Sequence, residues 1–482
     1  MTEPIKSAYP VQTRILTPIN EGSQFVSNSY IQFKINASEL PMWLVNDSYL
    51  RFDIHYKRSK YNCGAGKEGG TTAINKTYIR NAANIFDLIK VKYGGDDIYV
   101  QTFNIEQNTL NMLGYGDGYL EREYATFTTT NTIKNGMALL EFNNGTATSA
   151  TEDGEVAEAE HDIINVGIPI NQLLPIFQDI NSTGFPIGKL KRQIEINLYI
   201  AEPYKYLVDY DDAMEDFSIY FRRCKVTNDD GTDAKRQAII DVPISDRYQS
   251  KSVELRNVRM YCSCYVPTND EDGVITSKVN SSGIEYRYHL WHIGVREVTG
   301  INATNNLPFS VTTENTGALM LYCHDTKCSP SVMYRPNIQT LYLRFGEMQL
   351  PFQPISGDTW STPFEYRFTS DDVLNNVDTY YSLTNWDYNK SYKHKDKPDT
   401  STKVNDTAMQ NNRIPGGTFV LMGANFTNSP NKLGSPSSRW NHQYQASFNA
   451  LFPQTHNLRF ILGVKTEYGL IVKNGDIAKL NI

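Results

Sequence analysis

Two closely spaced cysteine pairs are the first residues of this 482-residue chain that could do chemistry. Cys262 and Cys264 stand one residue apart, and Cys323 and Cys328 flank His324. Thiolate and imidazole are ligands that zinc prefers. The spacing is not that of a zinc finger, however, and the first pair lies in a strand-like pattern that points both thiols to one face. We therefore expect free cysteines that are buried or at a strand edge, and no metal or other cofactor.

Two acidic segments offer the oxygen ligands that calcium prefers. The first lacks the glycine and the terminal Glu of an EF-hand loop, so we expect a solvated linker. The second starts at Asn269 with the sequence NDEDG, and no carboxylate follows at the required place, so we expect a turn. The first segment contains Asp209, Asp211, Asp212, Glu215 and Asp216.

The last candidates for a binding or catalytic site are a glycine-rich segment and two histidines. The segment Gly114–Gly118 is spaced like a phosphate loop, but such a loop opens a helix, whereas this segment follows a helical pattern. His289 and His292 are three apart in a strand pattern, on opposite faces, and Trp291 between them is expected in the core. The sequence has no nucleophile elbow and no HExxH helix. We therefore predict no catalytic residues and no enzyme.

Composition and charge narrow the function classes further. The net charge is −7 and the pI is about 5.7, which argues against a protein whose main task is to grip phosphates. In residues 1–30 the only cations are Lys6 and Arg14, against Glu3 and Glu21, so we expect no basic arm and no sequence-specific nucleic acid binding. We also expect no secretory signal and no transmembrane segment, because no suitable apolar run is present.

The elements that would position these residues are mostly β-strands, since apolar and polar residues alternate with a period near two. Long polar connections separate them, and loops of this length are usually functional or disordered. The longest span residues 59–76, 143–161 and 385–415. The expected strands are 31–36, 49–56, 85–93, 137–142 and 193–201, then 253–266, 285–295, 318–322, 340–345, 418–426 and 457–464.

One order of elements occurs twice along the chain. A strand, a hairpin partner, a helix, a strand, a short apolar segment and a strand run from 85 to 201 and again from 340 to 464. The helices are expected at 104–113 and 370–383. This repetition predicts an all-β protein with short helices in loops, built from two tandem copies of one β-sandwich. We place the boundary at the acidic joint 206–217, which gives domains 1–210 and 211–482.

Several segments carry a resemblance to a known family. They are the opening from Leu16 to Phe25, the strands IQFKIN (31–36) and YLRFDIHY (49–56), the hairpin VKYGGDDIYVQ, and the close LRFILGVKTEYGLIVKNGDI (458–477). Together they resemble the double jelly-roll major capsid proteins of virophages, polinton-like viruses and the wider tectivirus–adenovirus lineage.

The resemblance implies two tandem eight-stranded jelly rolls and a homotrimer that forms a pseudo-hexameric capsomer of an icosahedral virion. The partners that it implies are neighbouring capsomers and a penton or minor capsid protein, in a shell around double-stranded DNA that in this family often has a membrane beneath it. The alternative is a two-domain β-sandwich that binds carbohydrate or a receptor, a lectin-like adhesin or spike, through exposed Trp360, Trp386 and Trp440. That alternative predicts export, for which the sequence shows no signal.

Overall fold

The structure is a computed structural model of the whole chain. It describes residues 11–20, 22, 24–58, 61–62, 76–79, 81–115, 131–134, 137–143, 155–156, 162–177, 184–210, 251–299, 302–311, 316–326, 337–345, 348–356, 422–425, 443–451 and 457–481. Among these residues no helix is long and apolar enough to cross a membrane.

The first unit consists of two main sheets whose alternating apolar residues face each other. In β3, for example, Ile31, Phe33 and Ile35 are fully buried and alternate with more exposed residues. The sheet that we call the β4 sheet has the order β1-β15-β4-β12, and the β13 sheet has the order β3-β13-β7-β8. The strands are β1 (Gln12–Leu16), β2 (Gln24–Phe25, paired with β15), β3 (Tyr30–Ile35), β4 (Met42–Arg58), β7 (Phe86–Tyr93), β8 (Asp96–Gln101), β12 (Asp162–Pro169), β13 (Ile194–Ile200) and β15 (Lys251–Tyr265).

The second unit has the same construction. One sheet has the order β16-β23-β18-β21, with β24 paired to β23, and the other has the order β17-β22-β19-β20. The strands are β16 (Ile284–Thr299), β17 (Asn302–Ser310), β18 (Thr316–Asp325), β19 (Asn337–Phe345), β20 (Met348–Ser356), β21 (Met422–Asn425), β22 (Gln443–Leu451), β23 (Asn457–Lys473) and β24 (Asp476–Asn481).

The strand order identifies both units as jelly rolls. When the eight strands of these sheets are numbered in chain order, leaving β2 and β24 aside, one sheet of each unit has the order 1-8-3-6 and the other has 2-7-4-5. Two interlocked Greek keys produce this order. The predicted fold class, all-β with two tandem eight-stranded jelly rolls, is confirmed.

The eighth strand of the first unit changes the expected division of the chain. β15 lies beyond residue 210, yet it pairs with β1, β2 and β4. A division between 210 and 211 would separate it from its own sheet. We therefore propose that the units divide between Tyr265 and Ile284. The expected joint at 206–217 is described only as far as Tyr210.

The structure also changes which elements of the two halves correspond to each other. The strand at 137–142, which we equated with 418–426, is β10 of a separate small sheet, and β12 is the sixth strand of the first unit. That small sheet has the order β14-β6-β10-β9, and β11 pairs with β5. The strands are β5 (Tyr61–Asn62), β6 (Lys76–Ile79), β9 (Asn131–Lys134), β10 (Met137–Asn143), β11 (Glu155–Val156) and β14 (Leu207–Tyr210).

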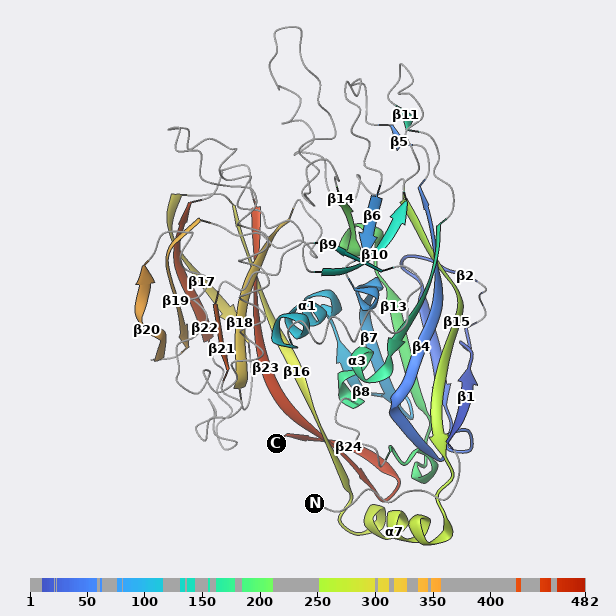
Figure 1. The fold of residues 1–482 in the computed structure, drawn as a ribbon. Coiled ribbons are helices and arrows are strands. Elements are labelled where there is room, and N and C mark those ends of the chain that lie inside the picture. Colours follow the sequence, from blue (N-terminus) through green and yellow to red (C-terminus); the bar gives the residue numbers. More distant parts are fainter. Residues whose placement is uncertain are drawn as a thin grey trace.

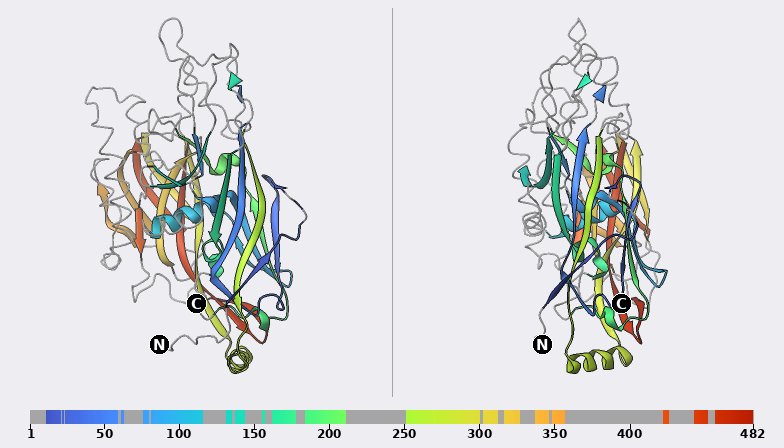
Figure 2. Two further views of the ribbon diagram at one scale, coloured as in Figure 1. Left: turned by 45° about the vertical axis from the view of Figure 1, so that its right-hand side comes forward. Right: turned by 90° about the vertical axis from the view of Figure 1, so that its right-hand side faces the viewer.

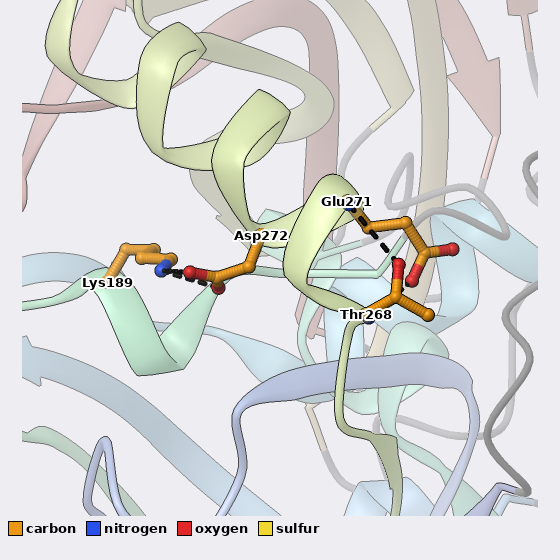
Figure 3. A network of polar contacts seen from close by, with 4 residues as sticks. All are labelled: Lys189, Thr268, Glu271 and Asp272. Carbon is orange, nitrogen blue, oxygen red and sulfur yellow. Dashed lines mark hydrogen bonds and ion pairs between the residues drawn. The ribbon is translucent and has the colours of Figure 1, made fainter.

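The expected turn at Asn269 is wrong, because helix α7 (Asn269–Asn280) begins there. The Thr268 hydroxyl accepts from the backbone N–H of Glu271 at 3.3 Å, and the Glu271 carboxylate accepts from the N–H of Thr268 at 2.7 Å. This capping box stabilises the first turn. Asp272 reaches Lys189 of the first unit at 2.5 Å, as Figure 3 shows.

The two units stand side by side with their strands upright (Figures 1 and 2). Helix α1 (Asn104–Tyr115) lies between them, and α7 lies at the base. β16 and β23 continue below the second unit and pass beneath the first. The other helices among the described residues are short: η1 (Ala82–Ile85), α3 (Ile170–Leu173), η2 (Pro175–Phe177), η3 (Ile187–Lys189) and α4 (Pro203–Tyr206).

Candidate structural site between the two units

Of the four candidate cysteines, the structure describes Cys262, Cys264 and Cys323. Cys262 and Cys264 lie in β15 as free thiols, 0% and 3% exposed, and burial raises the pKa of both. Cys323 lies in β18, and Cys328 falls outside the described residues. In the described part of the chain no three His, Cys, Asp or Glu side chains are grouped so that they could hold a metal ion.

The structure describes only part of the acidic cluster and of the glycine segment, and none of the three candidate tryptophans. Asp209 lies in β14, and the rest of its acidic cluster falls outside the described residues. Gly114 and Tyr115 are the last two residues of α1, so the glycine segment begins at the end of a helix and does not open one; Gly116–Gly118 fall outside the described residues. Trp360, Trp386 and Trp440 are outside the described residues.

The histidine strand lies at the contact between the units. Trp291 is 3% exposed, so the prediction that it belongs to the core is confirmed. His292 Nε2 lies 2.6 Å from the hydroxyl of Tyr468, and burial lowers the pKa of this histidine. His289 lies in the same strand, β16.

Helix α1 joins the first unit to β16 of the second through one buried amide. Gln107 is 4% exposed. Its Nε2 donates to the backbone carbonyl of Trp291 at 2.5 Å, and its Oε1 accepts from the backbone N–H of Trp291 at 3.3 Å. β16 is an edge strand of its sheet, and buried backbone groups at such an edge need partners. Gln107 therefore takes the place that a neighbouring strand would fill.

The same helix packs closely against β23 because that strand has a glycine at the contact. A Cβ atom on Gly463 would lie 2.5 Å from Cδ1 of Leu110 and 3.0 Å from Cε3 of Trp291. Leu110 is fully buried. Gly463 thus permits an approach of helix to strand that a larger residue would prevent.

Tyrosines join the lower half of β16 to the first unit. The Tyr286 hydroxyl donates to the carbonyl of Gly184 at 3.1 Å, and its ring lies 5.2 Å from that of Phe185. Tyr288 packs edge-on against Tyr99 with ring centroids 6.3 Å apart. Burial raises the pKa of both Tyr286 and Tyr288. Rings with one polar end suit this position, because each fills apolar space and also bonds to the backbone or stacks.

The hairpin between β23 and β24 docks on the first unit through its turn. Asn474 and Gly475 both have positive φ, 52° and 77°, as a type I′ turn requires. The carbonyl of Gly475 accepts from the Tyr93 hydroxyl at 2.6 Å and from the N–H of Lys191 at 2.9 Å. A Cβ on Gly475 would lie 3.0 Å from the carbonyl oxygen of Lys189. Glycine is therefore required both for the turn and for the contact.

The lower of these contacts lie in the hydrophobic core of the first unit, to which Tyr93, Tyr286 and Tyr288 belong. Leu470 and Val472 of β23, Ile477 of β24 and Val279 of α7 belong to the same buried cluster as the first unit's side chains. We call the contact made by Tyr93, Gln107, Leu110, Tyr286, Tyr288, Gly463 and Gly475 the seam. The lower ends of β16 and β23, together with β24 and α7, are thus built into the core of the first unit, unlike domains joined only by a linker.

Sequence reasoning did not find the seam, although two of its signals are readable. The pair Asn474-Gly475 is a hairpin signal. The long alternating run of β23 exceeds what one jelly-roll strand needs, and its lower half covers the first unit. No local pattern shows that Gln107 faces Trp291, because the two residues are 184 positions apart.

Comparisons with known proteins agree on the fold. No protein-family model matches the chain, and no curated protein matches it. A chain of the Sputnik virophage structure matches with a TM-score of 0.56 at 10% identity, over 99% of this chain and 90% of that one. The mavirus major capsid protein matches at 0.54 and 10%, over 98% and 90%. The Faustovirus major capsid protein matches at 0.50 and 10%, over 98% and 92%. The likeness concerns the fold, and in fold this chain is a double jelly-roll protein like the mavirus and Faustovirus major capsid proteins.

Proposed function

We propose that this chain is a structural capsid protein, the repeating unit of an icosahedral virion shell around double-stranded DNA. The observation that carries the proposal is the repeated jelly-roll order, 1-8-3-6 facing 2-7-4-5 in each unit, together with a likeness that extends over nearly the whole of both chains. The matching mavirus and Faustovirus proteins are the major capsid proteins of those viruses.

The seam supports a mechanical role. A shell unit must keep its shape while its sides bear lateral contacts, so two upright rolls have to act as one block. The shared core and the hydrogen bonds of Gln107, Tyr286 and Tyr93 across the seam supply that rigidity. Three such blocks around a threefold axis would present six upright rolls, a pseudo-hexagonal outline that tiles a surface.

The proposed partners follow from this assembly. They are two further copies of the chain in a homotrimer, then neighbouring capsomers and a penton or minor capsid protein, with a membrane beneath the shell. The net charge of −7 fits a shell protein that leaves the genome to other partners. The chain is proposed to have no enzymatic activity. The lectin-like alternative depends on three tryptophans outside the described residues and gains no support from the structure.

The experiment that tests the proposal is a native mass measurement on the purified full-length chain, followed by co-expression and particle purification. The proposal predicts a stable species of three times the 54.8 kDa chain mass, and shell-like particles when partner proteins are present. A monomer at every concentration, with no particles on co-expression, would contradict it.

A further inference from the structure

The outer face of the β4 sheet contains two arginines directly opposite each other. Arg259 of β15 is paired in register with Arg51 of β4, and both side chains are exposed. A β-bulge produces this arrangement: two residues of β15, including Asn257 at a φ of 52°, oppose one residue of β4 just above the pair. Like charges directly opposite on a sheet are destabilising.

Neighbouring charges on the same face are paired, but these two are not. Arg256 binds Glu254 at 2.6 Å, and Asn257 donates to Asp53 at 2.6 Å. By contrast, neither Arg51 nor Arg259 forms an ion pair with any residue that the structure describes. The next strand gives Arg51 no counter-charge either, because Gly167 of β12 is its partner in register. Among the residues that the structure describes, the two adjacent cations therefore have no carboxylate partner.

An aromatic and apolar surface borders the arginines. Tyr49 and Tyr261 are the next pair in register, and their rings stack with centroids 4.9 Å apart and planes at 7°. Ile15 of β1 continues this row and is 51% exposed. Arg and Tyr are enriched in protein interfaces and among their energetic hot spots.

The face points away from the second unit. β1, β15 and β4 lie on the far side of the first unit in Figure 1, and their sheet faces the viewer in the right-hand view of Figure 2. Among the described elements, none of the second unit therefore covers this side of the block.

We propose that the face made by Arg51, Arg259, Tyr49, Tyr261 and Ile15 binds a carboxylate-bearing surface of a second copy of this chain. This inference rests on the proposed function and specifies one lateral contact of the shell. A guanidinium pair recognises a carboxylate through bidentate hydrogen bonds, and a chain with a net charge of −7 supplies carboxylates to its neighbours. A polyanion such as DNA fits less well, because Asp53 and Glu254 lie in the next rows of the same face.

The test compares the full-length chain with R51A/R259A, R51K/R259K and the control K473A/K479A. The control removes the same charge from exposed positions on β23 and β24. Sedimentation velocity over a dilution series measures the concentration at which the oligomer dissociates, and thermal melting checks the fold. We expect R51A/R259A to raise that concentration roughly tenfold or more while its melting temperature is unchanged or higher, because a repulsive pair is removed. The lysine variant keeps charge without the guanidinium fork and should fall between, and the control should match the wild type.

Each other outcome is decisive. If R51A/R259A assembles like the wild type while the wild type forms oligomers, the inference is wrong and the proposed function stands. If the variant keeps its oligomers but loses affinity for a duplex DNA probe, the face binds nucleic acid and the inference is overturned. A wild type that never exceeds a monomer overturns both.

Discussion

The packing of helix α1 against Gly463 of β23 leaves no room for a side chain at that position. In Gly463→Ala the new Cβ would lie 2.5 Å from Cδ1 of Leu110, about 1 Å short of an ordinary carbon contact. The same Cβ would lie 3.0 Å from Cε3 of Trp291, so the methyl group has no free space to enter. Overpacking of this kind costs about 1–3 kcal/mol of unfolding free energy.

A double-mutant cycle separates this clash from other effects of the substitution. Leu110→Ala alone leaves a cavity at a fully buried position and should cost about 2–5 kcal/mol. The same truncation removes the atom that the new Cβ meets. The double variant G463A/L110A should therefore lose less than the sum of the single losses, by about 0.5–3 kcal/mol.

The unfolding free energy of each variant is measured by urea titration, with tryptophan fluorescence as the signal. The matched control is Gly273→Ala in α7, where a new Cβ would meet nothing within 4 Å. There alanine should be neutral or stabilise by up to about 1 kcal/mol, because it favours the helix. Strict additivity of the two seam substitutions would refute the packing that we describe.

Four further predictions concern the seam and the cap at its base. Gln107→Ala leaves the backbone N–H and carbonyl of Trp291 without partners and should lower the unfolding free energy by about 1–3 kcal/mol, measured by urea titration. Gly475→Ala is strained at a φ of 77° and meets the Lys189 carbonyl, so its melting temperature should fall below that of the wild type. Thr268→Ala removes the α7 cap and should cost about 1 kcal/mol, whereas Thr268→Ser should retain most of it. Burial is the largest cause that raises the pKa of Tyr93, so its neutral form is favoured in the folded state. The stability that the neutral Tyr93 hydroxyl contributes is complete below its unfolded pKa near 10 and is lost as pH rises through its folded pKa. Tyr93→Phe should therefore lose less unfolding free energy than the wild type when stability is measured from pH 9 to 11.

Local patterning predicted many of the strands, because alternation depends on neighbouring residues, and with them the fold class. It did not predict β1, β12, β17 or β22 as strands. The alternation in β3 and β7 appears in the sequence as IQFKIN and IFDLIKVKY, and burial follows it. The helix after β8 was also predicted from sequence and is found as α1. The turn chemistry of YGGDD was enough to place the β7–β8 hairpin, and Gly94 and Gly95 both have positive φ.

Long-range pairing was the part that the sequence could not supply. β15 is separated from β13 by residues 201–250, and the acidic stretch at 206–217 resembles a linker, so the sequence pattern places the boundary before β15. The pairing of β15 with β4 supports the later division that we propose. Without β15, the last strand of the first half is β13, the seventh strand of its jelly roll. The repetition in the sequence therefore matches β13 with β23, which is the eighth strand of the second jelly roll. α7 is a different case, because the Thr268-x-x-Glu271 capping box was readable, but the NDEDG sequence after Thr268 suggested a turn instead.

Neither the seam nor the arginine face could be predicted from the sequence, because both depend on contacts between residues that are far apart in the chain. The seam joins residues such as Tyr93 and Gly475, 382 positions apart, through a contact that only the assembled fold creates. Arg51 and Arg259 become neighbours only through the register of β4 with β15 and the bulge beside them. Neither arrangement leaves a periodic pattern in the chain.

The most direct test of the central claim is electron microscopy of the purified full-length protein with class averaging. The proposed capsid role predicts threefold particles whose projection shows six upright lobes, two from each chain, in a near-hexagonal outline. Particles with only two lobes at every protein concentration, or assemblies without threefold symmetry, would contradict it.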